Sequence, residues 1–345
     1  MSGEPTDNDW LIYRGGDTRP HDGVATRLPA PPPWRTFEGE PLVPPLEIPS
    51  DDLPDTAGRR LGVMARSYRP DPHTVALVNA ALYLRRPLLV TGKAGVGKSS
   101  LARSVARELR LGPVLHWPIT SRSAIGDGLY HYDALARLQE ANFRKLGGDG
   151  PVRVPETGRY IQLGPLGTAL LPTALPRVLL IDEMDKSDID LPNDLLNVFE
   201  DGGFAVPELS RLPEDPPVSE VTTADGRRVE IRGGRVACHA FPFVVITSNG
   251  EREFPVAFLR RCIRLDMAPP SRDRLAEIIA AQLGEAALER SEEIIDRFLD
   301  RREKRDIATD QLLNAIYLAT SAGNGRPLAP EMERALLRPL GDNGQ

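Results

Sequence analysis

Cysteine and long apolar runs are both scarce in this chain. The two cysteines among 345 residues, Cys238 and Cys262, form no metal-spaced set with the five histidines, so we expect reduced thiols and no metal site built from them. No apolar run approaches the ~20 residues that cross a bilayer. Because residues 1–10 are polar and lack the basic-then-apolar order of a signal peptide, we expect a cytoplasmic protein that does not enter a membrane.

An excess of positive charge is also missing. The net charge of −6 gives no overall attraction to nucleic acid, although a local basic stripe in the pore of an oligomer would not show in that sum. Binding to nucleic acid is therefore neither supported nor excluded. With 41% hydrophobic and 27% charged residues, the chain has the composition of a folded protein of one large domain or two smaller ones.

Proline is concentrated at the start of the chain, up to about Pro54. Because proline cannot donate hydrogen bonds to helices or strands, we expect an extended, proline-rich arm over residues 1–60. Two alternatives follow for this arm. It could be a disordered tail, or its aromatic residues could dock it on the body or on a partner, since disordered tails usually lack aromatics. The aromatic residues concerned are Trp10, Tyr13, Trp34 and Phe37.

Short apolar runs in the middle of the chain predict buried strands. Uninterrupted apolar strands indicate a sheet covered on both faces, hence parallel strands in an α/β fold. The runs are Leu88 to Val90, Val114 to Ile119, Val178 to Ile181 and Phe243 to Thr247. After Pro269 and Pro270 the apolar residues recur at helical spacing instead. We therefore expect an α/β core over residues 61–269 and a helical domain over residues 270–345.

The segment from Gly92 to Ser99 reads GKAGVGKS and fits the phosphate-loop pattern G-x-x-x-x-G-K-[ST]. A predicted strand precedes it and an amphipathic helix follows, so its backbone N–H groups would face phosphate oxygens at a helix N-terminus. Lys98 should span the β- and γ-phosphates, and the Ser99 hydroxyl should ligate Mg²⁺. The sequence thus predicts binding and hydrolysis of a nucleoside triphosphate, expected to be ATP with Mg²⁺. The residues expected to hold it are Gly92, Gly95, Val96, Gly97, Lys98, Ser99 and Ser100.

Two adjacent carboxylates, Asp182 and Glu183, end the apolar run that begins at Val178. Neighbours at a strand end point in different directions, so the two can have different roles. We expect Asp182 to hold Mg²⁺ and Glu183 to act as the general base on the attacking water. A third strand ends in Ser248 and Asn249, which would place an amide beside the γ-phosphate if the three strands are neighbours.

In this order, the motifs resemble those of the AAA+ ATPases, and within them the MoxR-like, helix-2-insert group of the dynein-related type. The resemblance covers about Tyr68 to Leu340 and implies a parallel-sheet P-loop NTPase core with a C-terminal helical lid. The matching segments are GKAGVGKSSLA, GPLGTALLP, LLIDEMDKSDIDLPNDLLNVFEDGGFAVPEL and VVITSNGEREFPVAFLRRC.

The resemblance also implies roles for single residues. Asn249 matches the sensor that positions the lytic water. Arg261 matches the arginine finger donated to the neighbouring subunit's nucleotide, with Arg260 as the adjacent candidate, although cysteine follows where phenylalanine is more usual. Without the resemblance, the two arginines would be interpreted as a solvated basic pair at a helix end.

Two further segments match family elements that face a central pore. Gly164 to Pro172 resembles the helix-2 insert. The residues around Asp225-Gly226 resemble the pre-sensor hairpin, and the same Asp-Gly signal also fits a plain surface hairpin. Ile307 stands where a second sensor arginine is often found, with Arg305 two residues earlier. The stretch from Gly126 to Tyr160 predicts a helical segment without assignable chemistry.

These observations favour a ring-forming, hexameric ATPase that remodels or activates a partner protein. By resemblance, that partner would carry a von Willebrand A domain. Two alternatives are a nucleotide-dependent nucleic-acid motor similar to the McrB restriction GTPases, and a nucleotide-gated scaffold without turnover. The lack of a separate basic domain argues against the motor, and the intact set of catalytic residues argues against the scaffold.

Overall fold

The computed structural model describes residues 9–16, 19–41, 68–146, 156–212, 217–302, 307–322 and 330–337. Residues 1–8, 17–18 and 42–60 of the predicted arm, and Arg305, lie outside these ranges. The core is a five-stranded sheet in the order β11-β1-β10-β5-β2, and every neighbouring pair is parallel. The strands are β1 (Leu88–Thr91), β2 (Leu115–Pro118), β5 (Val178–Asp182), β10 (Phe243–Ser248) and β11 (Ile263–Asp266). The predicted α/β fold with a parallel sheet is therefore confirmed.

Both faces of this sheet are covered, and alternate strand residues pack on opposite sides. In β5, Val178 and Leu180 belong to the hydrophobic cluster formed with α3 (Pro72–Leu84) and α4 (Lys98–Glu108). Leu179 and Ile181 belong to the opposite cluster. The helices that contribute to that opposite cluster include α7 (Pro165–Ala169), α8 (Leu191–Asp201) and α10 (Val256–Leu259). Burial on both sides explains why the strand residues are apolar without alternation.

A second sheet pairs the predicted hairpin with two short strands that lie earlier in the chain, whereas Gly164 to Pro172, the predicted helix-2 insert, contains a short helix and lies outside this sheet. Its order is β3-β4-β7-β8, and its strands are β3 (Tyr130–Tyr132), β4 (Ile161–Leu163), β7 (Val218–Thr222) and β8 (Arg228–Arg232). The predicted hairpin thus forms, with β7 and β8 antiparallel. Its turn is anchored on the core, because the fully buried Arg177, directly before β5, donates to Oδ2 of Asp225 at 3.1 Å. We call this sheet the insert sheet.

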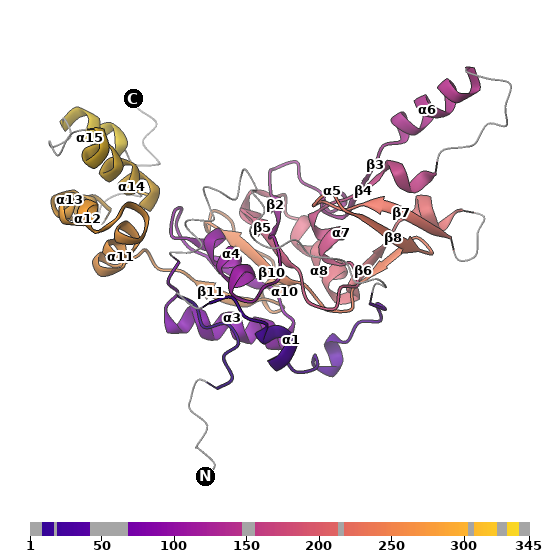
Figure 1. Ribbon diagram of the computed structural model, residues 1–345, viewed down its shortest axis with the longest axis horizontal. Coiled ribbons are helices and arrows are strands. Elements are labelled where there is room, and N and C mark those ends of the chain that lie inside the picture. The colour runs from indigo at the N-terminus through magenta and orange to yellow at the C-terminus, as the bar shows by residue number, and fades with distance from the viewer. Residues whose placement is uncertain are drawn as a thin grey trace, which may run out of the picture.

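Shorter elements surround the insert sheet. Helix α6 (Ala134–Leu146) lies in the stretch whose helical segment was predicted, and it projects away from the body at the upper right of Figure 1. The remaining elements are α5 (Ile125–Leu129), α9 (Pro207–Ser210) and the antiparallel pair β6 (Gly203–Ala205) and β9 (Arg235–Ala237).

The first described part of the arm packs against the core beside α3 and α4. Ile12 and Tyr13 are fully buried there. Oδ1 of Asn79 accepts the backbone N–H groups of Ile12 at 2.7 Å and Tyr13 at 3.0 Å. The Tyr13 hydroxyl lies 2.9 Å from the Ser104 hydroxyl on α4. The helix α1 (Gly23–Arg27) follows this contact along the lower edge of the body (Figure 1).

The second part of the arm reaches the far side of the core. A short 3₁₀ helix, Pro33–Arg35, leads into it. The buried Arg35 donates to the Phe199 carbonyl at 2.9 Å and lies 4.4 Å above the Phe241 ring, on which Phe37 stacks. Trp34, directly before Arg35, is 71% exposed. Of the four aromatic residues suggested for docking, Tyr13 and Phe37 thus hold the arm on the body. Trp34 faces solvent, and Trp10 is partly exposed with its ring in a T-shaped contact with Tyr83.

This arrangement predicts unequal effects for two aromatic residues of the arm. Tyr13→Ala should lower the free energy of unfolding by about 3 kcal/mol, because it empties a closely packed site. Trp34→Ala should change it by no more than about 0.5 kcal/mol, since the side chain is mostly in water. Urea denaturation followed by circular dichroism measures both. Equal effects of the two substitutions would show that the arm is not held by its buried residues.

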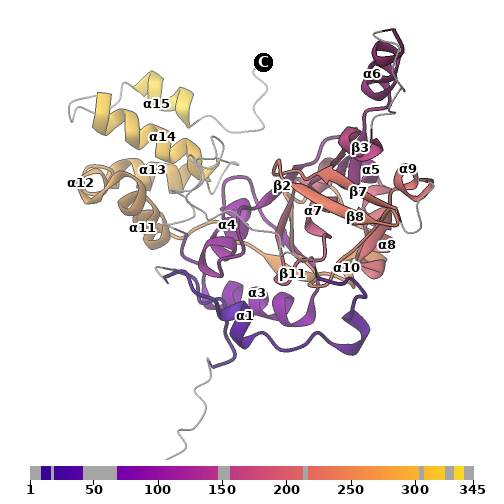
Figure 2. The ribbon, with the colours of Figure 1, turned by 45° about the vertical axis from the view of Figure 1, so that its right-hand side comes forward.

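The C-terminal helices form a separate layer, the lid, with its own apolar cluster around Leu275, Phe298 and Leu312. The helices are α11 (Arg272–Leu283), α12 (Glu285–Glu289), α13 (Glu292–Arg302), α14 (Thr309–Tyr317) and α15 (Pro330–Leu336). Figure 2 shows them together on the side of the core where α4 begins. Ile307 is buried in the lid cluster. Within the described ranges, no helix has the length and apolar character to span a membrane.

Candidate nucleotide site

The phosphate loop connects β1 to the first turn of α4. Gly95 and Gly97 have φ angles of 78° and 96°, in the left-handed region that glycine adopts without strain. Space restricts Gly95 as well. A Cβ atom there would lie 2.9 Å from the backbone nitrogen of Thr309 and 3.0 Å from Cβ of Ala308. The start of the lid helix α14 therefore lies directly on the loop.

A pocket of about 550 Å³ opens between the loop and the lid, a volume typical of sites for small ligands. Apolar side chains of Tyr68, Ile278 and Leu313 contribute to its wall. Ile278 on α11 and Leu313 on α14 line this pocket, whereas their neighbours on the same helices, Leu275 and Leu312, lie in the lid's own cluster.

Most of the predicted nucleotide-site residues meet at this pocket. From the phosphate loop and α4, Gly95, Val96, Gly97, Lys98, Ser99 and Ser100 line it, and from the strand ends Asp182, Glu183 and Asn249 do so. Gly92 adjoins the pocket through its carbonyl, which accepts a hydrogen bond from Lys98. Arg260 and Arg261 are not among the described residues that line it.

Lys98 joins the phosphate loop to Asn249, which directly follows β10. Its Nζ donates to the carbonyl of Gly92 at 2.6 Å and to Oδ1 of Asn249 at 2.8 Å. This contact exists because β10 lies between β1 and β5, so the expected neighbour relation of the three strands is confirmed. Burial lowers the pKa of Lys98, although the nearby Asp185 and Asp182 carboxylates act in the opposite direction. The ammonium group thus lies where bound phosphates would replace its contacts with the loop.

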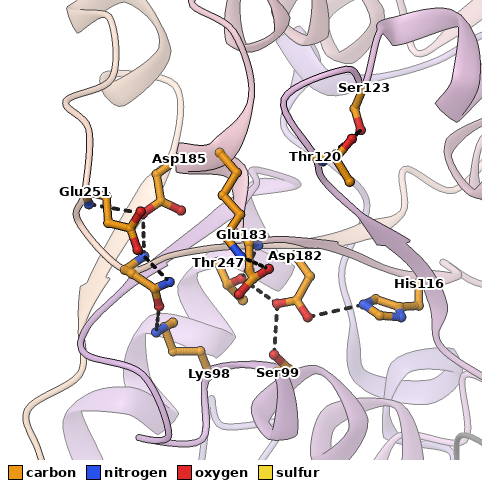
Figure 3. Close-up of polar contacts among 12 residues, drawn as sticks. Lys98, Ser99, His116, Thr120, Ser123, Asp182, Glu183, Asp185, Thr247 and Glu251 are labelled. Atoms are coloured by element: carbon orange, nitrogen blue, oxygen red, sulfur yellow. Dashed lines mark hydrogen bonds and ion pairs between the residues drawn. The ribbon is translucent and has the colours of Figure 1, made fainter. Parts of the chain in front are cut away.

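Asp182 is the centre of a hydrogen-bonded group at the carboxyl end of β5 (Figure 3). Its Oδ1 accepts from the Ser99 hydroxyl at 2.9 Å and from the Thr247 hydroxyl at 2.6 Å. Nε2 of His116 lies 3.2 Å from its Oδ2. Burial by itself would raise the pKa of Asp182, but these hydrogen bonds lower it below its ordinary value. The carboxylate therefore stays ionised near neutral pH.

The oxygen donors near Asp182 suit Mg²⁺ that is coordinated partly by a bound ligand. They suit less well a metal ion that is coordinated by protein side chains alone. Mg²⁺ commonly binds through one or two carboxylates together with substrate phosphates, and the Ser99 hydroxyl and Asp182 carboxylate oxygens are adjacent. In the described part of the chain, no group of three His, Cys, Asp or Glu side chains could hold a metal ion. Ser99 and Asp182 are thus suited to a cation that arrives with its nucleotide.

Glu183 has an unusual backbone for a non-glycine residue, with φ at 61°. Such conformations persist where the surroundings fix them, and they are frequent at functional sites. Its side chain is about half exposed and forms an ion pair with Nζ of Lys186 at 2.6 Å. The carboxylate of Asp182 is held instead by Ser99 and Thr247, so the adjacent acids have different environments.

Three residues of this group were missed in the sequence. Asp185 is buried, and its Oδ2 accepts the N–H groups of Asn249 at 2.9 Å and Glu251 at 3.1 Å, which fixes the turn that presents Asn249. His116 and Thr247 are polar residues inside apolar strand runs, a signal that could have identified both. Nothing in the sequence singles out Asp185.

The two candidate finger residues lie apart from the pocket, after α10. Arg261 Nε donates to Glu200 on α8, and its Nη1 donates to the Ala257 carbonyl at 3.2 Å. The Arg260 carbonyl accepts from Arg86. Arg261 thus does not contribute to the site of its own chain. The following residue, Cys262, is a buried free thiol whose pKa burial raises to about 12, which makes it unreactive.

A comparison with protein-family models found no match, and a comparison with curated proteins found none either. Among solved structures, the chain is similar to domain III of the replication initiation protein DnaA from Thermotoga maritima. The TM-score is 0.37 and the sequence identity 16%, over 79% of this chain and 94% of that one. Similarity at this level does not establish a family, so the function has to follow from the site itself.

Proposed function

We propose that this chain is an AAA+ ATPase of the MoxR-like type, which binds ATP with Mg²⁺ and hydrolyses it. One observation carries the proposal. Lys98, Asp182 and Asn249 follow three neighbouring parallel strands and meet at one pocket that the lid completes. A parallel sheet brings the carboxyl ends of its strands to one edge, which is where such folds bind nucleotides.

Each residue at this edge suits one part of phosphoryl transfer. The Lys98 ammonium would replace its contacts with loop carbonyls by contacts with phosphate oxygens. Ser99 and Asp182 would hold Mg²⁺, which neutralises charge on the transferring phosphoryl group when it is bound. Asn249 would orient the attacking water, and Glu183 would accept its proton. Lys186 contacts Oε2 of Glu183, so Oε1 is the oxygen that would accept the proton without loss of this ion pair.

The assembly that we propose is a ring, with six subunits, in which Arg261 serves the neighbouring subunit's nucleotide. The position of Arg261 supports this arrangement, because its guanidinium is directed to Glu200 and away from the pocket of its own chain. The proposed client is a protein, in particular one with a von Willebrand A domain. The insert sheet is the proposed region of contact, since it forms a separate layer beside the core (Figure 1).

One experiment separates this function from its rivals. The purified chain is titrated with ATP in a calorimeter, and phosphate release is then measured with Mg²⁺ and with EDTA. We expect binding together with Mg²⁺-dependent release. ATP binding without release would favour a nucleotide-gated scaffold. Release that depends on added DNA would favour a nucleic-acid motor, and the absence of any binding would refute the proposal.

Lys98→Ala should weaken ATP binding by about 10- to 100-fold, because hydrogen bonds to charged groups contribute ~1.5–3 kcal/mol each. The effect is on binding, since the ammonium contacts the phosphates of the ground state as well as those of the transition state. Calorimetry with ATP measures it. Arg272→Ala is the matched control, because it removes a positive charge from the lid at a residue paired with Asp296, outside the pocket. Unchanged affinity in the Lys98 variant would contradict this role.

A further inference from the structure

Thr247 in strand β10 is a buried polar residue next to the two acidic residues at the end of β5. The residue is fully buried, yet its hydroxyl lies between the two acidic residues at the end of β5. It donates to Oδ1 of Asp182 at 2.6 Å and accepts the backbone N–H of Glu183 at 2.8 Å. Figure 3 shows this hydroxyl between the two residues. A single side chain thus contacts both the metal-site carboxylate and the backbone of the general base.

The hydrogen bond from the Glu183 N–H to Thr247 lies where the backbone leaves β5 and takes an unfavourable conformation. β5 ends at Asp182, so the Glu183 N–H has left the ladder of the sheet. The residue then turns into the left-handed region at φ 61°. The Glu183 N–H is part-buried and therefore needs an acceptor, and a strained conformation persists only where its surroundings over-determine it. The Thr247 hydroxyl supplies that acceptor, and the backbone that it fixes sets the direction in which the Glu183 side chain departs.

We propose that Thr247 is a positioning residue for hydrolysis, which orients the Asp182 side chain and the Glu183 backbone through one hydroxyl. The inference rests on the proposed ATPase function. Asp182 also accepts from Ser99 and lies beside His116, so its orientation has other supports. The Glu183 backbone depends on Thr247 more directly. Loss of the hydroxyl should therefore affect the turnover number more than the binding of ATP.

The test compares variants that differ in the hydroxyl and in little else. Thr247→Val keeps the branched shape and removes the hydroxyl, whereas Thr247→Ser keeps the hydroxyl and removes a methyl group. Since a small displacement of a catalytic group can cost ~100-fold in rate, we expect Thr247→Val to lower kcat by about 10- to 100-fold. The dissociation constant of ATP should stay within about twofold, and Thr247→Ser should stay within about threefold of the parent kcat. Thr247→Ala is measured beside them in case valine impairs folding.

Thr168→Val is the matched control. Thr168 on α7 is also fully buried, and its hydroxyl accepts the backbone N–H of Ala224 at 2.9 Å, but it does not line the pocket. This variant loses the same kind of hydrogen bond at a residue that contacts neither member of the acidic pair through its hydroxyl. It should therefore lose stability in a comparable way while kcat remains at the parent value.

A second readout does not depend on activity. Hydrogen exchange of the Glu183 amide, followed by mass spectrometry, should be faster in Thr247→Val than in the parent and should be restored in Thr247→Ser. Parent-like turnover in Thr247→Val, or equally slow turnover in Thr247→Ser, would overturn the proposal. If the parent chain releases no phosphate, the proposed function fails, and unchanged exchange in Thr247→Val would then refute the contact independently.

Discussion

Glu183→Gln is expected to lower the turnover number by about 10²- to 10⁴-fold, the usual contribution of a general base, and to leave ATP affinity nearly unchanged. The amide has almost the shape of the carboxylate but cannot accept the proton of the attacking water. Lys98, Ser99 and Asp182 remain in place, so the nucleotide should bind and persist. Single-turnover phosphate release and calorimetry on the same preparation separate the two quantities.

The control for this variant is Glu220→Gln. Glu220 is an exposed carboxylate of the insert sheet, paired with Arg228 and remote from the pocket, so its loss should leave the basal rate at the parent value. If Glu183→Gln hydrolyses ATP at the parent rate, another group accepts the proton, and the assignment of the general base is wrong.

Arg261→Ala is expected to lower the rate by about 10³-fold or more, because an arginine finger contributes ~10³ to 10⁵ in phosphoryl transfer. ATP binding should remain, since the guanidinium acts on charge that develops during transfer. In the proposed ring the site is completed between subunits, so the specific activity of the parent should rise with protein concentration and that of the variant should not. Arg260→Ala, measured in parallel, decides between the two adjacent arginines.

Mixing the two inactive variants tests the shared site directly. Glu183→Gln subunits keep a finger and Arg261→Ala subunits keep a base, so mixed rings contain some complete interfaces. Activity should partly recover. A pull-down with one variant tagged verifies that the two assemble together. Co-assembly without any recovery would contradict a site shared between interfaces that work independently. The remaining model would then be a ring in which one inactive site stops hydrolysis at all the others.

The sequence predicted the parallel sheet because its strands are short, uninterrupted and apolar, which is characteristic of burial on both faces. The order of the strands could not be predicted from such runs, and it is the order that brings Asn249 to Lys98. The pairing of the hairpin with β3 and β4 in one sheet was missed for the same reason. Pairing between distant strands depends on tertiary packing, which local patterns do not encode.

Within the candidate site, the residues that match a motif were found and those that support them were not. Lys98 and Asp182 belong to patterns with fixed spacing. Asp185 and Thr247 act through contacts across 64 or more residues of sequence. Tyr13 and Trp34 illustrate the same limit, because both are aromatic residues of one proline-rich arm and only the fold determines that the first is buried.

The ion pair between Arg177 and Asp225 has a mechanical consequence. The carbonyl of Arg177 also accepts the backbone N–H of Phe243, so the hairpin turn and the beginnings of β5 and β10 are joined at one residue. Separating a buried guanidinium from its carboxylate would leave an uncompensated charge, which costs ~3–5 kcal/mol. In the proposed ATPase, a force applied to the insert sheet would therefore reach the amino ends of the same two strands whose carboxyl ends lead into Glu183 and Asn249.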